Sequence, residues 1–206
     1  GALNSCILRG NTSSDGAGGA SLDTGGTMNN CLVVGNTASS TGGGVEIDYA
    51  GSAALNNCTI SGNSADTGGG VELYEGGTLN NCIVFGNTGI TGKDIHKTFS
   101  GQTVRFTCAS DGVTNGVNGC ITNNPLFTDA GAGDFRLSAA SPSINAGDNT
   151  YAPTNVTPYD LAGNPRIVNG TVDMGAYEKM VVTATVVPSN GPYAGGNVVV
   201  ITNCSE

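Results

Sequence analysis

The chain has 206 residues, only 11% of them charged, and its net charge is −9, with seven Lys and Arg residues against sixteen Asp and Glu. Binding to nucleic acid draws much of its affinity from Lys and Arg neutralising phosphates, so this composition argues against a nucleic-acid partner. Apolar runs stay far below the roughly 18 residues of a membrane-spanning helix, which argues against membrane insertion.

A ten-residue block recurs four times between Leu3 and Thr88. Each copy contains a Cys and, five residues later, an Asn that follows a Gly; the intervals between copies are 25, 27 and 24 residues. The cysteines are Cys6, Cys31, Cys58 and Cys82, and the asparagines are Asn11, Asn36, Asn63 and Asn87. Rigid blocks with length differences confined to the connectors are typical of a stacked solenoid.

A second block, between the Cys blocks, alternates apolar and polar residues, as in Val45-Glu46-Ile47 and Val71-Glu72-Leu73. This period of two indicates strands with apolar residues inside and carboxylates outside, and the frequent Gly, Asn and Thr disfavour helix. We therefore expect an all-β, right-handed parallel β-helix over residues 1–120, with the cysteines pointing inward. The repeated Asn should form a corner column, because Asn tolerates left-handed backbone and its amide can bond the next copy.

The repeat weakens after Asn87. Residues 91–95 take the place of the Gly-Gly-Val strand, residues 102–108 predict one more strand, and from residue 121 the chain becomes rich in Pro and loops. Several motifs follow in order: Asn124-Pro-Leu-Phe-Thr-Asp129, Asp134-Phe-Arg-Leu137, Ser141-Pro-Ser-Ile-Asn-Ala-Gly147, Asp160-Leu-Ala-Gly-Asn-Pro-Arg166 and Asp173-Met-Gly-Ala-Tyr-Glu178.

These motifs resemble the C-terminal part of the secreted bacterial β-helix proteins called choice-of-anchor Q domain proteins. The chain departs from that pattern at Asn124 and Asn145, where Asp is common. The upstream repeats are similar to those of chlamydial polymorphic membrane proteins. The resemblance implies a secreted or cell-surface β-helix, with residues 121–178 as its loop-rich C-terminal cap, and it brings no catalytic residues.

Residues 179–206 form a short β segment that resembles the first strands of an immunoglobulin-like TIG domain. A complete sandwich of that type needs roughly 100 residues. We therefore expect that the chain begins and ends inside larger modules, since it also opens directly inside a repeat at Gly1.

The seven cysteines fall into two groups. The four repeated ones are expected to be reduced core residues, and no Cys-x-x-Cys pair indicates zinc. Cys108 and Cys120 lie outside the repeat and flank the loop 111–119, which favours a disulfide and a secreted protein. Cys204 is left without a partner in this sequence.

Carboxylates give the main candidate for a ligand site. Glu46 and Glu72 should stack one turn apart on an outer face, with Asp48 and Glu75 nearby, and such a ladder could hold Ca²⁺. The competing interpretation is a solvated face with no cofactor. Nothing indicates catalysis: the arginines a lyase would use are scattered, and His96, the only histidine, has no Ser or Cys motif beside it and is expected at the surface.

Arg166 lies in the sequence among acidic residues of the motif region, Asp160, Asp173 and Glu178. An ion-pair clamp that holds the cap loops together is the expected role, with a binding site as the alternative.

The sequence therefore predicts a non-catalytic, extracellular β-solenoid that is a structural or adhesive part of a bacterial surface or secreted protein. Its expected partners are further copies of itself, joined through the solenoid ends or by addition of its C-terminal strands, and surface glycans. The alternative is a β-helix protein that binds or cleaves polysaccharides.

Overall fold

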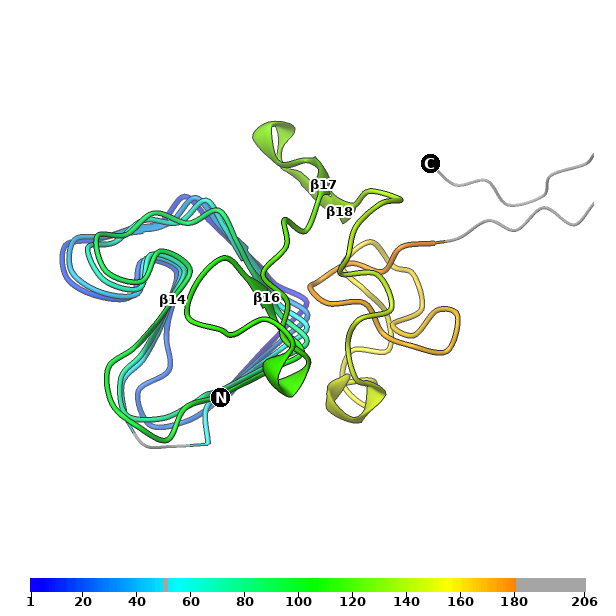
Figure 1. The fold of residues 1–206 in the computed structure, drawn as a ribbon. Helices are drawn as coiled ribbons and strands as arrows, with labels where there is room; N and C mark the ends of the chain where they lie inside the picture. Colours follow the sequence, from blue (N-terminus) through cyan, green and yellow to red (C-terminus); the bar gives the residue numbers. More distant parts are fainter. Residues whose placement is uncertain (50–51, 181–206) are drawn as a thin grey trace, which may run out of the picture.

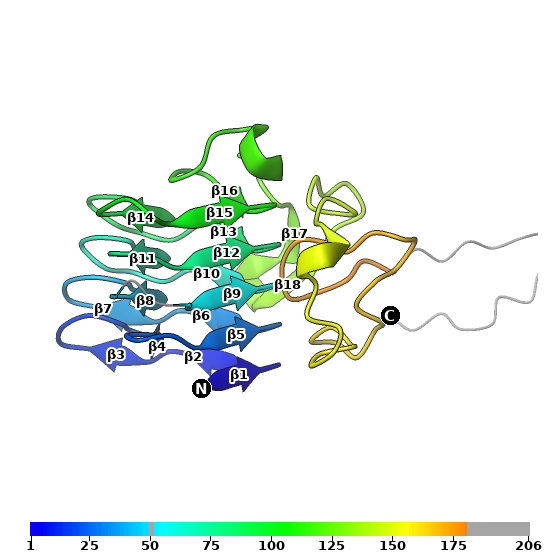
Figure 2. The same cartoon turned by 90° about the horizontal axis from the view of Figure 1, so that it is seen from below.

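The computed structural model describes residues 1–49 and 52–180, and it confirms an all-β parallel solenoid of about four turns. Figure 1 looks down the solenoid axis, and Figure 2 shows the turns stacked from β1 to β16. The chain runs counterclockwise in Figure 1 while it advances toward the viewer, so the solenoid is right-handed as expected. The TIG-like β segment lies, apart from its first two residues, outside the described residues, as does Cys204.

Four parallel sheets, which we name A to D, form the walls of the solenoid. Sheet A contains β1 (Ala2–Asn4), β5 (Thr27–Asn29), β9 (Ala54–Asn56), β12 (Thr78–Asn80) and β15 (Thr103–Arg105). Sheet B contains β2 (Ile7–Arg9), β6 (Leu32–Val34), β10 (Thr59–Ser61), β13 (Ile83–Val84) and β16 (Cys108–Ala109). Sheet C contains β3 (Thr12–Ser13) and β7 (Thr37–Ala38), and sheet D contains β4 (Ala20–Ser21), β8 (Val45–Ile47), β11 (Val71–Leu73) and β14 (Ile95–Lys97). The single strand predicted over 102–108 is instead two strands, β15 and β16, separated by a turn.

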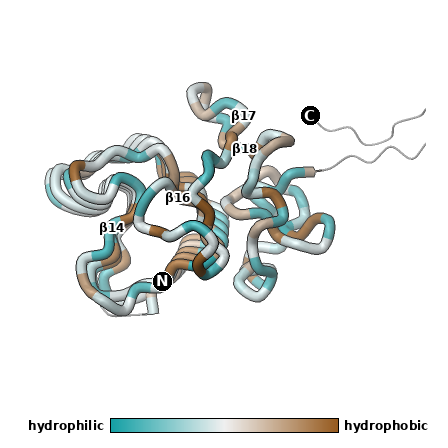
Figure 3. The backbone as a smooth tube through the Cα atoms, in the orientation of Figure 1, coloured by the Kyte–Doolittle hydropathy of each residue, from teal (hydrophilic) through white to brown (hydrophobic). Residues whose placement is uncertain are grey.

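The interior consists of columns of equivalent apolar residues, one from each turn. Successive turns pair in register, so Met28 lies beside Leu55 and Val45 beside Val71. The repeated cysteines point inward as predicted: Cys31, Cys58 and Cys82 are fully buried free thiols, and Cys6 in the first turn is half-buried. Figure 3 shows the apolar positions recurring at the same places in every turn.

The corner asparagines form a hydrogen-bonded ladder. The backbone and side-chain N–H groups of Asn36 both donate to Oδ1 of Asn63 at 2.9 Å, and those of Asn63 donate to Oδ1 of Asn87 at 3.0 Å. The expected bonding between copies is therefore confirmed. The expected left-handed backbone is wrong at these positions: it occurs at the residues just before the cysteines, for example Asn57 at φ 49°.

The repeated Gly pairs lie where the chain passes close to this ladder. A Cβ atom on Gly44 would lie 2.6 Å from the carbonyl oxygen of Gly70 and 2.8 Å from Cγ2 of Ile60. Only glycine fits such an approach, which accounts for the regular Gly-Gly spacing in the sequence.

The last turn is closed by carboxylates and by a loop. Asp94, fully buried, ends the ladder: its Oδ1 accepts the backbone and side-chain N–H groups of Asn87 at 3.1 and 3.0 Å. Asp111 accepts the backbone N–H groups of Lys93, Asp94 and Ile95 at 2.8, 2.8 and 3.2 Å, in place of a further strand. The loop 109–121, with the short helix η1 (Val117–Gly119), crosses this end of the solenoid (Figure 1).

The motif region lies beside the solenoid rather than over its end. Residues 122–180 contain β17 (Phe127–Asp129), η2 (Ala130–Ala132), β18 (Asp134–Leu137) and η3 (Asn149–Tyr151), and they lie along the flank formed by sheet B (Figure 2). The asparagines with left-handed backbone, just before the cysteines, bond to this region through their side-chain amides. The Nδ2 groups of Asn30, Asn57 and Asn81 donate to the backbone carbonyl oxygens of Tyr159, Asp173 and Asp148, respectively, at 2.9–3.0 Å. We call residues 122–180 the flank region.

The expected disulfide between Cys108 and Cys120 is wrong, since both are buried free thiols. The two cysteines lie on opposite faces of sheet B. Cys108 pairs in register with Ile83 and packs outward against Leu137 and Met174 of the flank region, whereas Cys120 packs in the solenoid interior. Their separation in sequence suggested a short closed loop, but the alternation of strand faces places the two sulfur atoms apart.

Candidate functional site

The carboxylates singled out in the sequence line up on the outer face of sheet D. Ser21, Glu46, Glu72 and His96 pair with one another in register across β4, β8, β11 and β14. Sheet D lies where the outline of each turn bends inward between two outward loops (Figure 1). Glu72 is therefore enclosed although it faces away from the core, with 1% of its surface exposed.

Glu72 and His96 form the central pair of this column. The carboxylate of Glu72 is 2.8 Å from Nδ1 of His96 and accepts the hydroxyl of Thr98 at 2.6 Å. The His96 side chain remains 26% exposed. This pairing was missed, because His96 was interpreted as an isolated surface residue. Its interval of 24 residues from Glu72 matches the neighbouring repeat interval and could have revealed it.

Two further carboxylates of the face have raised pKa values. Burial is the main cause of the raised pKa of Glu46, whose carboxylate also accepts the hydroxyl of Thr41. The pKa of Asp48 is raised by burial first and then by the charge of Asp23. Both carboxylates therefore hold a proton more readily than free side chains, chiefly because burial disfavours their charged form.

The carboxylates that the sequence offers as possible Ca²⁺ ligands do not gather into one cluster. Among residues 1–49 and 52–180, no three His, Cys, Asp or Glu side chains come together in a metal-binding group. The carboxylate oxygens of Glu72 already form hydrogen bonds with His96 and Thr98, and Glu75 is exposed on the adjoining loop.

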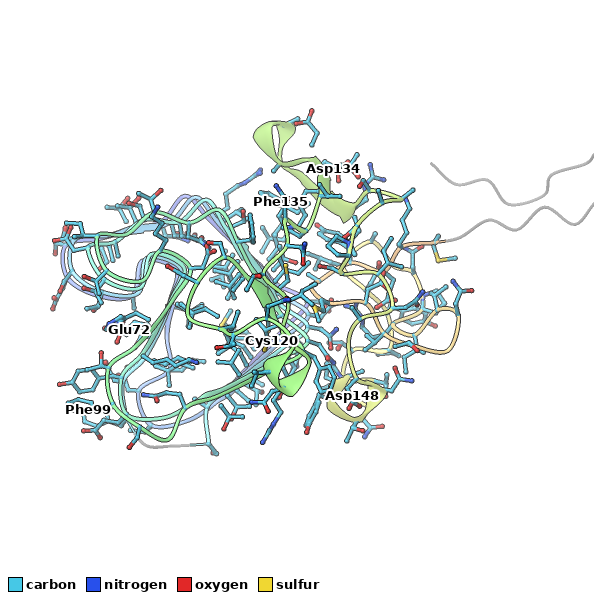
Figure 4. The ribbon with its side chains drawn as sticks, in the orientation of Figure 1. Glu72, Phe99, Cys120, Asp134, Phe135 and Asp148 are labelled. Atoms are coloured by element: carbon cyan, nitrogen blue, oxygen red, sulfur yellow. The ribbon has the colours of Figure 1, made fainter. Side chains whose placement is uncertain are left out.

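Exposed aromatic side chains lie on the loops just after sheet D. Tyr49, Tyr74 and Phe99 come from three successive turns and are 59%, 40% and 55% exposed. The rings of Tyr74 and Phe99 meet edge to face with centroids 4.9 Å apart. Figure 4 shows Phe99 on this outward loop, next to the bend that contains Glu72. We call these aromatics, together with Glu46, Asp48, Glu72 and His96, the sheet D face.

The Arg166 group lies elsewhere, buried between the flank region and the solenoid. Arg166 donates to Oε1 of Glu178 from Nε at 3.1 Å and from Nη2 at 2.5 Å, and its Nη1 donates to Asn30 Oδ1 at 2.8 Å. The predicted ion-pair clamp is confirmed, and it holds the flank region to the second turn. Asp160 and Asp173 contribute by accepting backbone N–H groups, for example that of Glu178 on Asp160 at 2.8 Å.

Burial makes Cys58, Cys108 and Cys120 poor nucleophiles. It raises the pKa of Cys108 to about 12 and raises the pKa values of Cys58 and Cys120 as well. Thiolate is the nucleophilic form of cysteine, so these residues act as packing groups rather than as nucleophiles.

No family model matches the chain, and no curated protein matches it. In the described residues, none of the helices is of the length and apolar character needed to cross a bilayer.

Proposed function

We propose that the chain is a non-catalytic, extracellular adhesive β-solenoid of a bacterial surface or secreted protein, and that the sheet D face binds neutral glycans. The resemblance of residues 121–178 to choice-of-anchor Q proteins supports the location. The observation that carries the binding role is the group of exposed aromatics beside the half-buried carboxylates of Glu46 and Asp48.

Neutral sugars suit this face for two physical reasons. Their hydroxyl groups can donate to the half-buried carboxylates of Glu46 and Asp48, while their C–H faces can pack against Tyr49, Tyr74 and Phe99. Anionic sugars suit it less, because Glu46, Asp48 and Asp23 repel negative charge. Successive turns also carry hydrogen-bonding groups and aromatic rings along the axis, as binding to a long polymer would require.

The test is binding of the purified chain to a panel of neutral polysaccharides, measured by affinity electrophoresis and titration calorimetry. Tyr49→Ala and Phe99→Ala should each weaken binding roughly three- to tenfold. Tyr159→Ala is the matched control, since Tyr49 and Tyr159 are both 59% exposed but Tyr159 lies in the flank region. Equal losses in Tyr49→Ala and Tyr159→Ala, or no binding by the parent chain, would refute the proposal.

Polysaccharide cleavage is a second candidate, favoured by the Glu72–His96 pair. A carboxylate bonded to Nδ1 orients an imidazole so that Nε2 can take a proton from a substrate. Pectin and alginate panels with added Ca²⁺ would detect product release. If the parent chain cleaves a polysaccharide and both His96→Ala and Glu72→Gln abolish that cleavage, catalysis rather than adhesion is the function. Glu46→Gln tests whether the neighbouring turn takes part in cleavage.

End-to-end stacking of solenoids is the remaining variant of the structural role. The loop 109–121 and Asp111 cover the last turn, so stacking through that end would require their removal. Sedimentation velocity over a wide concentration range tests this variant, and a concentration-independent monomer would exclude it. Addition of the C-terminal strands to another molecule concerns residues that lie outside the described ones.

A further inference from the structure

A cleft separates the solenoid from the hairpin formed by β17, η2 and β18. It consists of two adjoining cavities of about 360 and about 520 Å³, which share Ser61, Gly62 and Phe135 in their walls. The hairpin projects beside sheet B in Figure 1, and Figure 4 shows Phe135 on its side facing the solenoid. We call this space the corner cleft; it is separate from the sheet D face, which lies on another wall of the solenoid.

The floor of the corner cleft is built from two columns of the repeat. One column is Arg9, Val34 and Ser61, in register on the outer face of sheet B, and Phe85 continues it just after β13, where its carbonyl oxygen accepts the hydroxyl of Ser61 at 2.7 Å. The other is the glycine before each corner Asn, such as Gly35 at φ 64°, where a Cβ atom would meet nothing within 4 Å. The first column is largely covered, since Val34 and Ser61 are 3% and 6% exposed, whereas the glycine column is open and runs along the solenoid axis across four turns.

The opposite wall of the cleft consists of mostly uncharged residues, many of them with small side chains. It is made by residues 130–133, an Ala-Gly-Ala-Gly segment, and by Phe127 and Leu126, of which Leu126 is 40% exposed. The two hairpin carboxylates are engaged: Asp129 accepts the N–H of Ala132 at 3.0 Å, and Asp134 pairs with Arg136 at 2.7 Å.

The two ends of the corner cleft differ in chemistry. At the first turn, the guanidinium of Arg9 lies over Gly133, where a Cβ atom would be 2.6 Å from its Nη2. Arg9 has no ion-pair partner among residues 1–49 and 52–180. At the fourth turn, Phe85, Leu126 and Phe127 make an apolar end. A ligand with a carboxylate at one end and a large apolar group at the other is complementary to both ends.

We propose that the corner cleft binds an extended peptide segment in which an acidic residue precedes a large apolar residue by four positions. Arg9 and Phe85 are three turns apart, which is about 14 Å at roughly 4.8 Å per turn. An extended peptide rises about 3.3 Å per residue, so four residues span this distance. Residues four apart also project from the same side of an extended strand, so both anchors face the floor. A peptide supplies the large apolar side chain that the fourth-turn end accommodates, whereas a saccharide does not.

Fluorescence anisotropy with the labelled peptide Gly-Asp-Ala-Thr-Ala-Phe-Gly tests the proposal on the whole chain. Saturable binding is expected, weakened about tenfold or more when the peptide Asp is replaced by Asn. Similar loss is expected when the Phe is replaced by Ala or when one residue between them is deleted. These three peptides test the charge, the apolar anchor and the spacing separately.

Protein variants locate the site. Arg9→Ala should weaken binding about tenfold or more, whereas Lys93→Ala, which removes an exposed positive charge from the turn before β14, should leave it unchanged. Gly131→Leu should block the cleft, because a Cβ atom there meets only Asp129 Oδ1 at 3.4 Å and Gly131 lines both cavities. Unchanged far-UV circular dichroism of each variant shows that it still folds.

Three results would overturn the proposal: no saturable binding, equal affinity for the Asp and Asn peptides, or equal affinity of the parent chain and Arg9→Ala. An oligogalacturonate that binds with the same dependence on Arg9 and Gly131, while the peptide does not, would overturn the peptide as the occupant.

Discussion

Replacing Asn63 by Ala should show how much the corner ladder contributes to stability. Asn63 is 1% exposed, and its Oδ1 accepts both N–H groups of Asn36 at 2.9 Å. Its Nδ2 donates to Val33 O and to Asn87 Oδ1 at 3.0 Å. Alanine would leave two buried donors of Asn36 without an acceptor.

Each buried donor left unpaired costs about 1–3 kcal/mol, and losing the two bonds made by Nδ2 adds to this. We expect Asn63→Ala to lower the free energy of unfolding by about 3–5 kcal/mol. Asn11→Ala should cost less than about 1 kcal/mol, because Asn11 is exposed and its backbone N–H still donates to Asn36 at 2.9 Å.

Guanidinium chloride unfolding, followed by circular dichroism and by fluorescence of the six tyrosines, measures the difference; the chain has no Trp. Asn155→Ala, at an exposed position of the flank region, is the control and should change little. Equal destabilisation by Asn63→Ala and Asn11→Ala would refute the reasoning, because burial of the ladder would then not matter.

Other predictions concern single features of the fold. Asp111→Ala removes the acceptor of three backbone N–H groups at the last turn and should cost about 2–4 kcal/mol, measured by the same unfolding assay; no loss would mean that water replaces the carboxylate fully. Gly44→Ala should destabilise by at least about 2 kcal/mol, since its methyl group would meet the backbone of the next turn, and a neutral result would contradict the close approach. Burial, which outweighs the attraction of Arg166, raises the pKa of Glu178 from 4.5 to about 7. The folded state therefore binds this proton more tightly than the unfolded state, so stability should fall by up to about 3 kcal/mol as pH rises from 4.5 to 7, and Glu178→Gln should remove that dependence in a pH series of unfolding curves. Thiol titration in denaturant without reductant should count one thiol fewer in Cys108→Ser than in the parent chain; one thiol more would show that Cys108 had been bonded to Cys120.

Much of the sheet D face could be deduced from the sequence, because Glu46 and Glu72 occupy the same place in successive copies. The pairing of His96 with Glu72 follows the same interval but was hidden, since residues 91–95 no longer carry the Gly-Gly-Val pattern that marks the strand. The aromatics Tyr49, Tyr74 and Phe99 lie on loops of unequal length, where repeat spacing no longer predicts which side chains meet.

The corner cleft could not be deduced, because one of its walls comes from the repeat and the other from a hairpin that begins about forty residues beyond the last copy. No periodicity relates Arg9 to Gly133. The same holds for the Arg166 clamp, where Arg166 reaches Asn30 across 136 residues of sequence.

The sequence by itself determined the solenoid, its inward columns and its asparagine ladder, because in a stacked repeat each residue contacts its equivalent one copy away, and spacing is then a direct record of contact. Tertiary structure alone decided where the flank region docks, which face of sheet B receives Cys108, and how the last turn is closed. Those contacts depend on shape and on pairing of buried polar groups between distant segments, and neither leaves a periodic signal in the chain.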